Sequence, residues 1–106
     1  MGLFELLSGK DINKWIEECK NTPGAVLIDV RGRDEYNSGH IPGSINIPLN
    51  SINSVSGRIK EKETKIFVYC LSGARSAQAA SQMKRIGYTS ILNIGGINRY
   101  TGKMES

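Results

Sequence analysis

The chain has 106 residues, which is enough for one compact domain with one hydrophobic core and too few for two. Its fourteen lysines and arginines are scattered among ten aspartates and glutamates, which favours a small anionic partner over nucleic acid. Two cysteines are too few for a disulfide-rich secreted scaffold, and the longest apolar run, residues 66–71, is too short to span a membrane. We therefore expect a soluble, monomeric, cytoplasmic protein that binds neither nucleic acid nor membrane and needs no metal or other cofactor.

The first third of the chain is predicted to contain a strand, a helix and a second strand. Residues 3–7 are candidates for a short strand, and Ser8 begins the Ser-x-x-acid spacing of a helix N-cap. One apolar stripe at helical spacing then predicts a helix, and its members are Ile12, Trp15, Ile16 and Cys19. Pro23 and Gly24 end this helix, and the apolar residues 26–30 predict a buried strand after it.

The middle of the chain continues the alternation. Residues 33–37 predict a short helix, followed by a turn-rich loop, and residues 45–49 predict a brief strand in which Pro48 limits the backbone pairing. Apolar residues at helical spacing predict a short amphipathic helix over residues 52–59. Residues 66–69, Ile-Phe-Val-Tyr, are a continuous apolar run that is typical of a strand buried on both faces.

The last third is predicted to contain a longer helix, a fifth strand and a short final helix. The long helix runs from Arg75 to about residue 86, with Gly87 as its stop, and three residues are expected to face inward: Ala77, Ala80 and Met83. Residues 90–94 predict the fifth strand. Residues 95 and 96, both glycine, favour a tight turn over a phosphate site because no Gly-Lys-Ser/Thr follows them.

Buried strands separated by helices predict an α/β fold: a single domain over residues 1–106, with a five-stranded parallel sheet and helices on both faces. Ligands of such sheets bind beyond the carboxyl ends of the strands. Cys70 follows directly after the buried run 66–69, so it is expected at one of these ends.

Cys70 is the strongest candidate for a catalytic residue. A short polar loop containing Gly73 separates it from the helix that begins at Arg75, so loop amides and the positive end of a helix are expected to face the sulfur. Helix N-termini and nearby cations lower a cysteine pKa from about 8.5 to roughly 3.5–7.5, which produces the reactive thiolate. A cysteine after a buried strand is commonly only a core residue, but this loop and its arginine favour thiolate chemistry.

Four other residues have a structural and a functional interpretation. Cys19 lies in an apolar helical stripe, which favours a role in the core. His40, between Gly39 and Ile41 in a turn, is a candidate general base, but a structural hydrogen-bonding role is favoured. Asp29 and Arg31 stand where a strand meets its loop, and they either shape the mouth of the site or form an ion pair that braces the loop.

Three segments together make the chain resemble a single-domain member of the rhodanese family: "VLIDVRGRDEYNSGHIPGSINIPL", "VYCLSGARSAQAA" and "ILNIGGINRY". The resemblance implies a sheet of five parallel strands and a catalytic cysteine, here Cys70, that carries sulfane sulfur as a persulfide. It implies a substrate-binding loop made of Leu71, Ser72, Gly73, Ala74 and Arg75. The motif positions of the family place Asp29, Arg31 and His40 as supporting residues, and Tyr100 stands where many relatives have tryptophan.

On this basis the expected activity is that of a thiosulfate sulfurtransferase, which moves sulfur from an anion such as thiosulfate to cyanide or a thiol. A cysteine phosphatase on a similar scaffold needs five residues between its cysteine and its arginine, whereas only four lie between Cys70 and Arg75, and none of them is acidic. A third hypothesis is a binding module that carries persulfide to a partner protein without turnover of its own. The sequence leaves the physiological donor and acceptor open.

Overall fold

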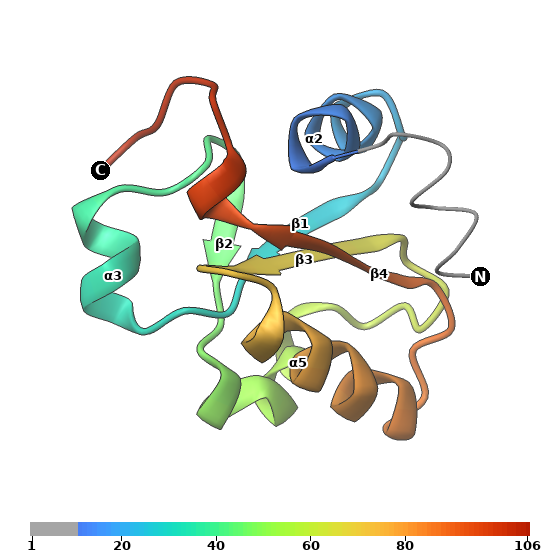
Figure 1. Cartoon of the computed structure of the whole chain (residues 1–106). Helices are drawn as coiled ribbons and strands as arrows, with labels where there is room; N and C mark the ends of the chain where they lie inside the picture. Colours follow the sequence, from blue (N-terminus) through green and yellow to red (C-terminus); the bar gives the residue numbers. More distant parts are fainter. Residues whose placement is uncertain (1–10) are drawn as a thin grey trace.

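Four parallel strands form the centre of the structure, a computed structural model that describes residues 11–106 (Figure 1). The strands are β1 (Val26–Asp29), β2 (Ser44–Asn46), β3 (Ile66–Cys70) and β4 (Ile91–Gly96), in the order β2-β1-β3-β4. Because every pair is parallel, the carboxyl ends of the strands lie at one edge of the sheet. The described residues contain four strands rather than the predicted five, and the remaining predicted strand, residues 3–7, lies outside them.

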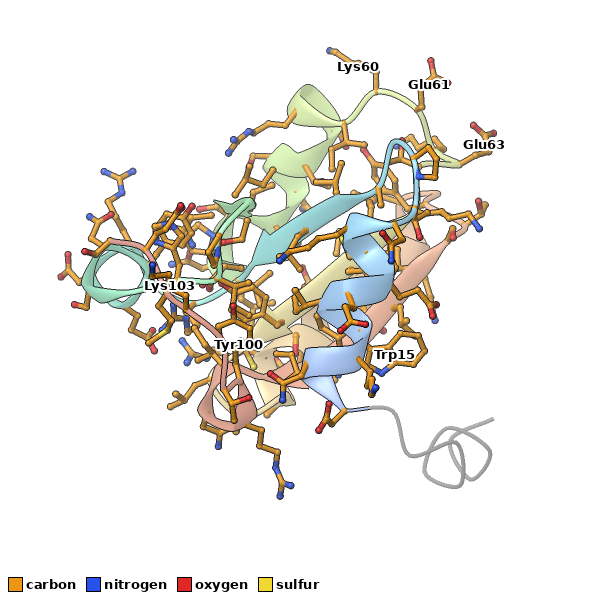
Figure 2. All side chains as sticks on the ribbon, turned by 90° about the horizontal axis from the view of Figure 1, so that it is seen from above. Trp15, Lys60, Glu61, Glu63, Tyr100 and Lys103 are labelled. Atoms are coloured by element: carbon orange, nitrogen blue, oxygen red, sulfur yellow. The ribbon has the colours of Figure 1, made fainter. Side chains whose placement is uncertain are left out.

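Helices cover both faces of this sheet, as the sequence predicted. One face packs against α5 (Ala74–Arg85), η1 (Leu49–Ser54) and α4 (Val55–Arg58), and the other packs against α2 (Ile12–Lys20) and η2 (Ile97–Arg99). Seen from above, α2 lies across the sheet, with Trp15 at its outer side (Figure 2). The short helix α3 (Arg33–Ser38) lies beyond the carboxyl ends of the strands (Figure 1).

Strand β3 shows how the apolar run is divided between the two layers. All five of its residues are buried, and alternate side chains face opposite sides of the sheet. Val68 and Cys70 join the core on the α5 side, whereas Phe67 and Tyr69 join the core on the α2 side. The side chain of Cys70 therefore lies on the α5 face at the carboxyl edge.

The N-cap of α2 is Asp11, the acidic residue of the predicted Ser-x-x-acid spacing, whereas Ser8 lies outside the described residues. The Asp11 carboxylate accepts hydrogen bonds from the backbone N–H groups of Asn13 and Lys14, at 3.0 and 3.2 Å. Asp11 immediately precedes the first helical residue, so its short side chain reaches these unpaired donors. The helix ends at Lys20, before Pro23, as expected.

The inward face of α5 also differs from the prediction. Ala80 and Met83 are buried as expected, but Ala77 is exposed and the buried stripe starts at Ser76. A spacing of strictly three residues drifts around a helix that has 3.6 residues per turn, whereas positions 76, 79, 80 and 83 stay on one face. This difference places the Ser76 hydroxyl against the end of β3.

The predicted strand over residues 45–49 is shorter in the structure, because β2 ends at Asn46. Past that point the Ile47 N–H donates to the Asp29 carbonyl and the Leu49 N–H to the Val30 carbonyl, both at 3.0 Å. Pro48, between them, has no N–H to donate, and the chain turns into η1. Over residues 11–106, no helix combines the length and the apolar character needed to cross a bilayer.

Candidate active site

Cys70 is the last residue of β3, and its side chain receives hydrogen bonds from the turn that follows. The residue is 1% exposed. The Gly73 N–H donates to the Cys70 Sγ atom at 3.0 Å, and the Ser76 hydroxyl lies 3.4 Å from the same sulfur. Gly73 adopts a φ of 106° just before α5, which is the left-handed conformation that favours glycine. The turn thus curls its N–H groups over the sulfur.

These donors change the acidity of the Cys70 thiol. Burial raises its pKa, but the hydroxyl of Ser76 and the backbone N–H groups of Ser76, Gly73 and Ser72 stabilise the thiolate and bring the pKa below the ordinary value. Burial alone acts on Cys19 and raises its pKa. Hydrogen bonding therefore moves the pKa of Cys70 in the direction opposite to that of Cys19.

Arg75 is held by a glutamate that the sequence analysis did not identify. Two of its guanidinium nitrogens donate to Glu35, with Nη1–Oε1 and Nη2–Oε2 distances of 2.8 and 3.0 Å. The Gly32 N–H donates to Oε1 of Glu35 at 2.9 Å. The hydrogen bonds from Arg75 lower the pKa of Glu35 to about 2. The pair links the start of α5 to α3, so Arg75 is a clamp as well as a cation near Cys70.

Asn93 is a second residue that the sequence analysis missed. Its Oδ1 atom accepts from the Ser76 hydroxyl at 2.7 Å and from the Gly95 N–H at 3.0 Å, and its Nδ2 atom donates to the Gly73 carbonyl at 3.1 Å. One amide side chain thereby connects β4 to the loop and to Ser76. In the sequence, Asn93 stands out only as a polar residue within the apolar strand Ile91–Gly96. Glu35 gives no such signal, because it is one of several charged residues in α3.

Gly96 brings the end of β4 against the Cys70 loop. A Cβ atom at this position would overlap the Leu71 carbonyl oxygen and the Ser72 Cα atom. The Leu71 carbonyl also accepts the Asn98 N–H at 3.1 Å. The loop is therefore supported from β4 by backbone contacts, while the side chains of Leu71 and Ser72 are exposed.

Asp29 and Arg31 form a buried ion pair beside the site. Arg31 donates from Nε and Nη2 to the Asp29 carboxylate, with a shortest distance of 2.8 Å, and its Nη2 atom also donates to the Gly39 carbonyl at 2.7 Å. The Asp29 side chain is fully buried and that of Arg31 is 7% exposed. This geometry corresponds to the bracing interpretation, because the pair fixes the loop before the Gly-His-Ile-Pro-Gly turn.

His40 lies in that turn, in contact with other residues of the loop and the C-terminal segment. Its ring stacks on the Tyr36 ring with centroids 3.8 Å apart, and Nδ1 lies 2.9 Å from the Tyr36 carbonyl oxygen. Its backbone pairs with Glu105, and Nε2 lies 3.9 Å from a Glu105 carboxylate oxygen. Both ring nitrogens thus face partners other than Cys70.

Tyr100 stands at the position where the sequence departs from the family pattern. It follows η2, packs against the core on the α2 side, and donates its hydroxyl to the Lys103 carbonyl at 2.8 Å. Figure 2 shows Tyr100 and Lys103 near each other on the C-terminal segment. The tyrosine hydroxyl thus anchors the last residues of the chain.

The model of the Rhodanese-like domain family matches residues 10–103. The chain belongs to the rhodanese-like family. Thiosulfate sulfurtransferase PspE from Escherichia coli K12 is 37% identical over 71 residues, which are 66% of this chain and 68% of the relative. The structure titled "rhodanese with anions from E. coli" has a TM-score of 0.71 and 32% identity, and the match covers 76% of this chain and 96% of that one.

Other rhodanese-like relatives have different names and greater lengths. Putative sulfur carrier protein YrkF from Bacillus subtilis is 38% identical over 80 residues, which are 74% of this chain and 43% of YrkF. Several relatives are named tRNA uridine(34) hydroxylase, and the chain spans about 30% of their length. The chain spans less than half of several curated relatives, so membership of the family leaves the specific activity open.

Proposed function

We propose that this protein is a sulfurtransferase that moves sulfane sulfur from a donor such as thiosulfate to cyanide or a thiol through a Cys70 persulfide. The observation that carries the proposal is the set of donors around the Cys70 sulfur, which lowers the pKa of the thiol despite its burial. A thiolate held at the carboxyl edge of a parallel sheet is a suitable nucleophile for sulfur. PspE, a relative named for this activity, supports the same reaction class.

The reaction consists of two displacements at sulfur. In the first, the Cys70 thiolate attacks the outer sulfur of thiosulfate, the S–S bond of the donor breaks, and sulfite leaves with the electron pair. In the second, cyanide or an acceptor thiolate attacks the terminal sulfur of the persulfide, and the electron pair of the broken S–S bond returns to Cys70. Neither step needs an external oxidant or reductant.

The loop residues 71–75 are proposed to hold the donor anion and the persulfide. Gly73 and Ser72 contribute backbone N–H groups near the sulfur, and Arg75 adds a cation that Glu35 keeps in place. Asp29, Arg31 and His40 are assigned supporting roles, because their partners stabilise the adjacent loops. The cycle requires a free thiol, which fits a reducing compartment such as the cytoplasm.

Cys70→Ser tests the proposal directly, because the substitution is nearly isosteric and replaces a good nucleophile with a poor one. We expect thiosulfate:cyanide sulfur transfer to fall by at least about a hundredfold. Wild type incubated with thiosulfate should gain one sulfur atom by mass spectrometry, and dithiothreitol should remove it. Cys19→Ser is the matched control and should keep both properties. Persulfide formation that survives Cys70→Ser would overturn the assignment.

A second candidate function is a sulfur carrier that loads a persulfide but turns over slowly with small acceptors. It is favoured by the relative YrkF, which is named a putative sulfur carrier. Stoichiometric loading of Cys70 together with negligible turnover toward cyanide and thiols would support the carrier. Multiple turnovers would support the enzyme.

A further inference from the structure

Strand β4 contains a bulge where it passes the end of β3. Val68 lies opposite Asn93, but the next residue of β3 lies opposite Gly95. Ile94 is therefore an extra residue in β4, and Gly95 takes a φ of 101°, in the left-handed region that favours glycine. Bulges re-aim side chains and are frequent beside active sites. Here Asn93, at the edge of the bulge, reaches the first turn of α5.

Two backbone groups fix the orientation of the Asn93 amide. The Gly95 N–H can only donate, so the side-chain atom 3.0 Å from it must be the acceptor Oδ1. The Gly73 carbonyl can only accept, so the side-chain atom 3.1 Å from it must be the donor Nδ2. Asn93 therefore presents an acceptor to Ser76, whose hydroxyl oxygen lies 2.7 Å from Oδ1.

Ser76 has one hydroxyl proton and three acceptors within reach. Measured from the Ser76 oxygen, Asn93 Oδ1 lies at 2.7 Å, the Gly73 carbonyl oxygen at 3.1 Å and Cys70 Sγ at 3.4 Å. A distance of 2.7 Å is the usual one for an O–H···O bond, and a neutral thiol sulfur is only a weak acceptor. The Ser76 proton therefore points to Asn93 while Cys70 is uncharged.

We propose that Asn93 is a positioning residue that holds the Ser76 proton away from the Cys70 sulfur while Cys70 is a neutral thiol and gives it up when the sulfur becomes charged. The inference rests on the proposed function, since it concerns the nucleophile of the same reaction. In the neutral state the Cys70 S–H donates to the Ser76 oxygen. When the thiol proton leaves to solvent, the thiolate is the stronger acceptor, and the hydroxyl turns to it. Asn93 is exposed, so water replaces the hydroxyl at Oδ1.

This role makes Asn93 an opponent of Cys70 ionisation. By binding the Ser76 hydroxyl, Asn93 stabilises the neutral state and keeps the pKa of Cys70 from falling further. A thiolate of very low pKa is abundant but weakly nucleophilic, so Asn93 preserves the reactivity of the sulfur. A merely structural Asn93 would act in the opposite direction. Its bond to the Gly73 carbonyl supports a residue whose N–H donates to the sulfur, and loss of that support would make ionisation harder.

The test is the pH profile of Cys70 alkylation by iodoacetamide in Asn93→Ala. Without the competing acceptor, the Ser76 hydroxyl is freer to bind the thiolate. We expect the pH midpoint to fall by about half a unit, the effect of part of one hydrogen bond, because the Gly73 carbonyl remains a weaker competitor. The plateau rate at high pH should fall by less than about twofold, since the thiolate is less basic.

Two further variants assign the shift to the Ser76 hydroxyl. In a Ser76→Ala background, Asn93→Ala should produce no downward shift, because no hydroxyl proton remains to be released. Asn53→Ala, at an exposed asparagine of η1, is the matched control and should leave the midpoint unchanged. A midpoint that stays the same or rises in Asn93→Ala, or a fall that persists without the Ser76 hydroxyl, would overturn the proposal.

Asn93→Asp tests the same role in the other direction. The carboxylate still accepts from Ser76 and from the Gly95 N–H but is a stronger acceptor than the amide, so the alkylation midpoint should rise. Part of this rise should disappear in the Ser76→Ala background, whereas charge repulsion alone would leave it intact and would count against the proposal. Alkylation involves no sulfur transfer, so the two proposals fail separately. A wild type that forms no persulfide would refute only the sulfurtransferase, and normal persulfide loading without these shifts would refute only the role of Asn93.

Discussion

Cys70 is 1% exposed and Cys19 is half-buried, yet the pKa of Cys70 is lowered whereas that of Cys19 is raised. Burial opposes the charged form of both thiols, so the difference lies in hydrogen bonding. Cys70 faces the donors of the following turn, and Cys19 belongs to the apolar surface of α2. Burial alone would raise the pKa of both thiols and would not separate them as the hydrogen bonds do.

The pH dependence of alkylation should distinguish the two thiols. Iodoacetamide reacts with the thiolate, so the rate at each cysteine rises as its thiol ionises. We expect the half-maximal rate at Cys70 to occur at a lower pH than that at Cys19 in the folded protein, and the two profiles to converge in denaturant. Peptide mass spectrometry after timed labelling gives both profiles in one experiment. Coinciding profiles in the native state would contradict the proposed activation of Cys70.

Ser76→Ala should raise the pKa of Cys70, because the Ser76 hydroxyl, 3.4 Å from the Cys70 sulfur, is one of the groups that lower it. The pH midpoint of Cys70 alkylation should move upward, and the alkylation rate at mildly acidic pH should fall. Alanine fits the buried helical position without a new contact. Ser81→Ala, an exposed position on the same helix, is the control and should leave the midpoint unchanged.

Cys70 and Arg75 could be found in the sequence because a buried strand, a glycine-containing loop and a helix follow one another there. The partners of these residues could not be found in this way. Glu35 lies 40 residues before Arg75, and Asn93 lies 17 residues after Ser76, so both contacts depend on the packing of separate elements. A polar residue inside an apolar strand was the only local sign of Asn93.

At the scale of elements, the close approach of β4 to the Cys70 loop depends on Gly96. Gly96→Ala places a Cβ atom against backbone atoms of Leu71 and Ser72, which cannot rotate away as a side chain would. We expect a loss of about 2 kcal/mol in the free energy of unfolding, typical of overpacking. Sulfur transfer should fall at least tenfold, because the displaced loop carries the donors to Cys70.

Gly57→Ala is the matched control for this substitution. Gly57 lies in α4, and a Cβ atom there would meet no other atom within 4 Å. Alanine also has a better helix propensity, so we expect stability to rise by about 0.5–1 kcal/mol with activity unchanged. Urea denaturation and steady-state rates give both quantities. Similar stability and activity in Gly96→Ala and wild type would show that the loop tolerates displacement.

The elements themselves were largely predictable from apolar periodicity, and the errors concern boundaries and faces. Strand 66–69 and the helix after it appear close to the predicted positions. The face of α5 was wrong because Ser76, a polar residue, occupies a buried position where it reaches Cys70 and Asn93. Apolar periodicity cannot identify a residue that is buried for its hydrogen bonds.

At the scale of the whole molecule, two ion pairs connect segments around the carboxyl edge of the sheet. Asp29–Arg31 is buried and fixes the loop after β1, whereas Glu35–Arg75 is partly exposed and joins α3 to α5. Because the sheet was predicted to be parallel, the candidate site was expected at the edge formed by the carboxyl ends of the strands. The order of the strands and the position of α3 against α5 are three-dimensional properties that the spacing of residues did not reveal.

Protonation of Glu35 in acid should lower the free energy of unfolding of the protein. Its pKa is about 2 in the folded protein, below the ordinary value of 4.5, because Arg75 and the Gly32 N–H bind its charged form. A group whose pKa is lowered by folding stabilises the protein fully above its unfolded pKa, and this stabilisation is lost as the pH falls through the folded value. The contribution of Glu35 should therefore be complete above pH 4.5 and disappear toward pH 2.

Glu35→Gln isolates this contribution. The amide keeps an oxygen that accepts from Gly32 or Arg75 but carries no charge to lose on acidification. Since the Glu35 side chain is 39% exposed, we expect the variant to be less stable than wild type at pH 6 by at most about 1 kcal/mol. The two free energies of unfolding, measured with urea at successive pH values, should approach each other between pH 4.5 and 2.

The control is Glu63→Gln, which removes a carboxylate on the loop before β3, far from α3 (Figure 2). It should leave the pH dependence parallel to that of wild type. If Glu35→Gln also ran parallel to wild type down to pH 2, the clamp between α3 and α5 would contribute nothing to stability. Arg75 would then be free to turn toward an anion bound beside Cys70.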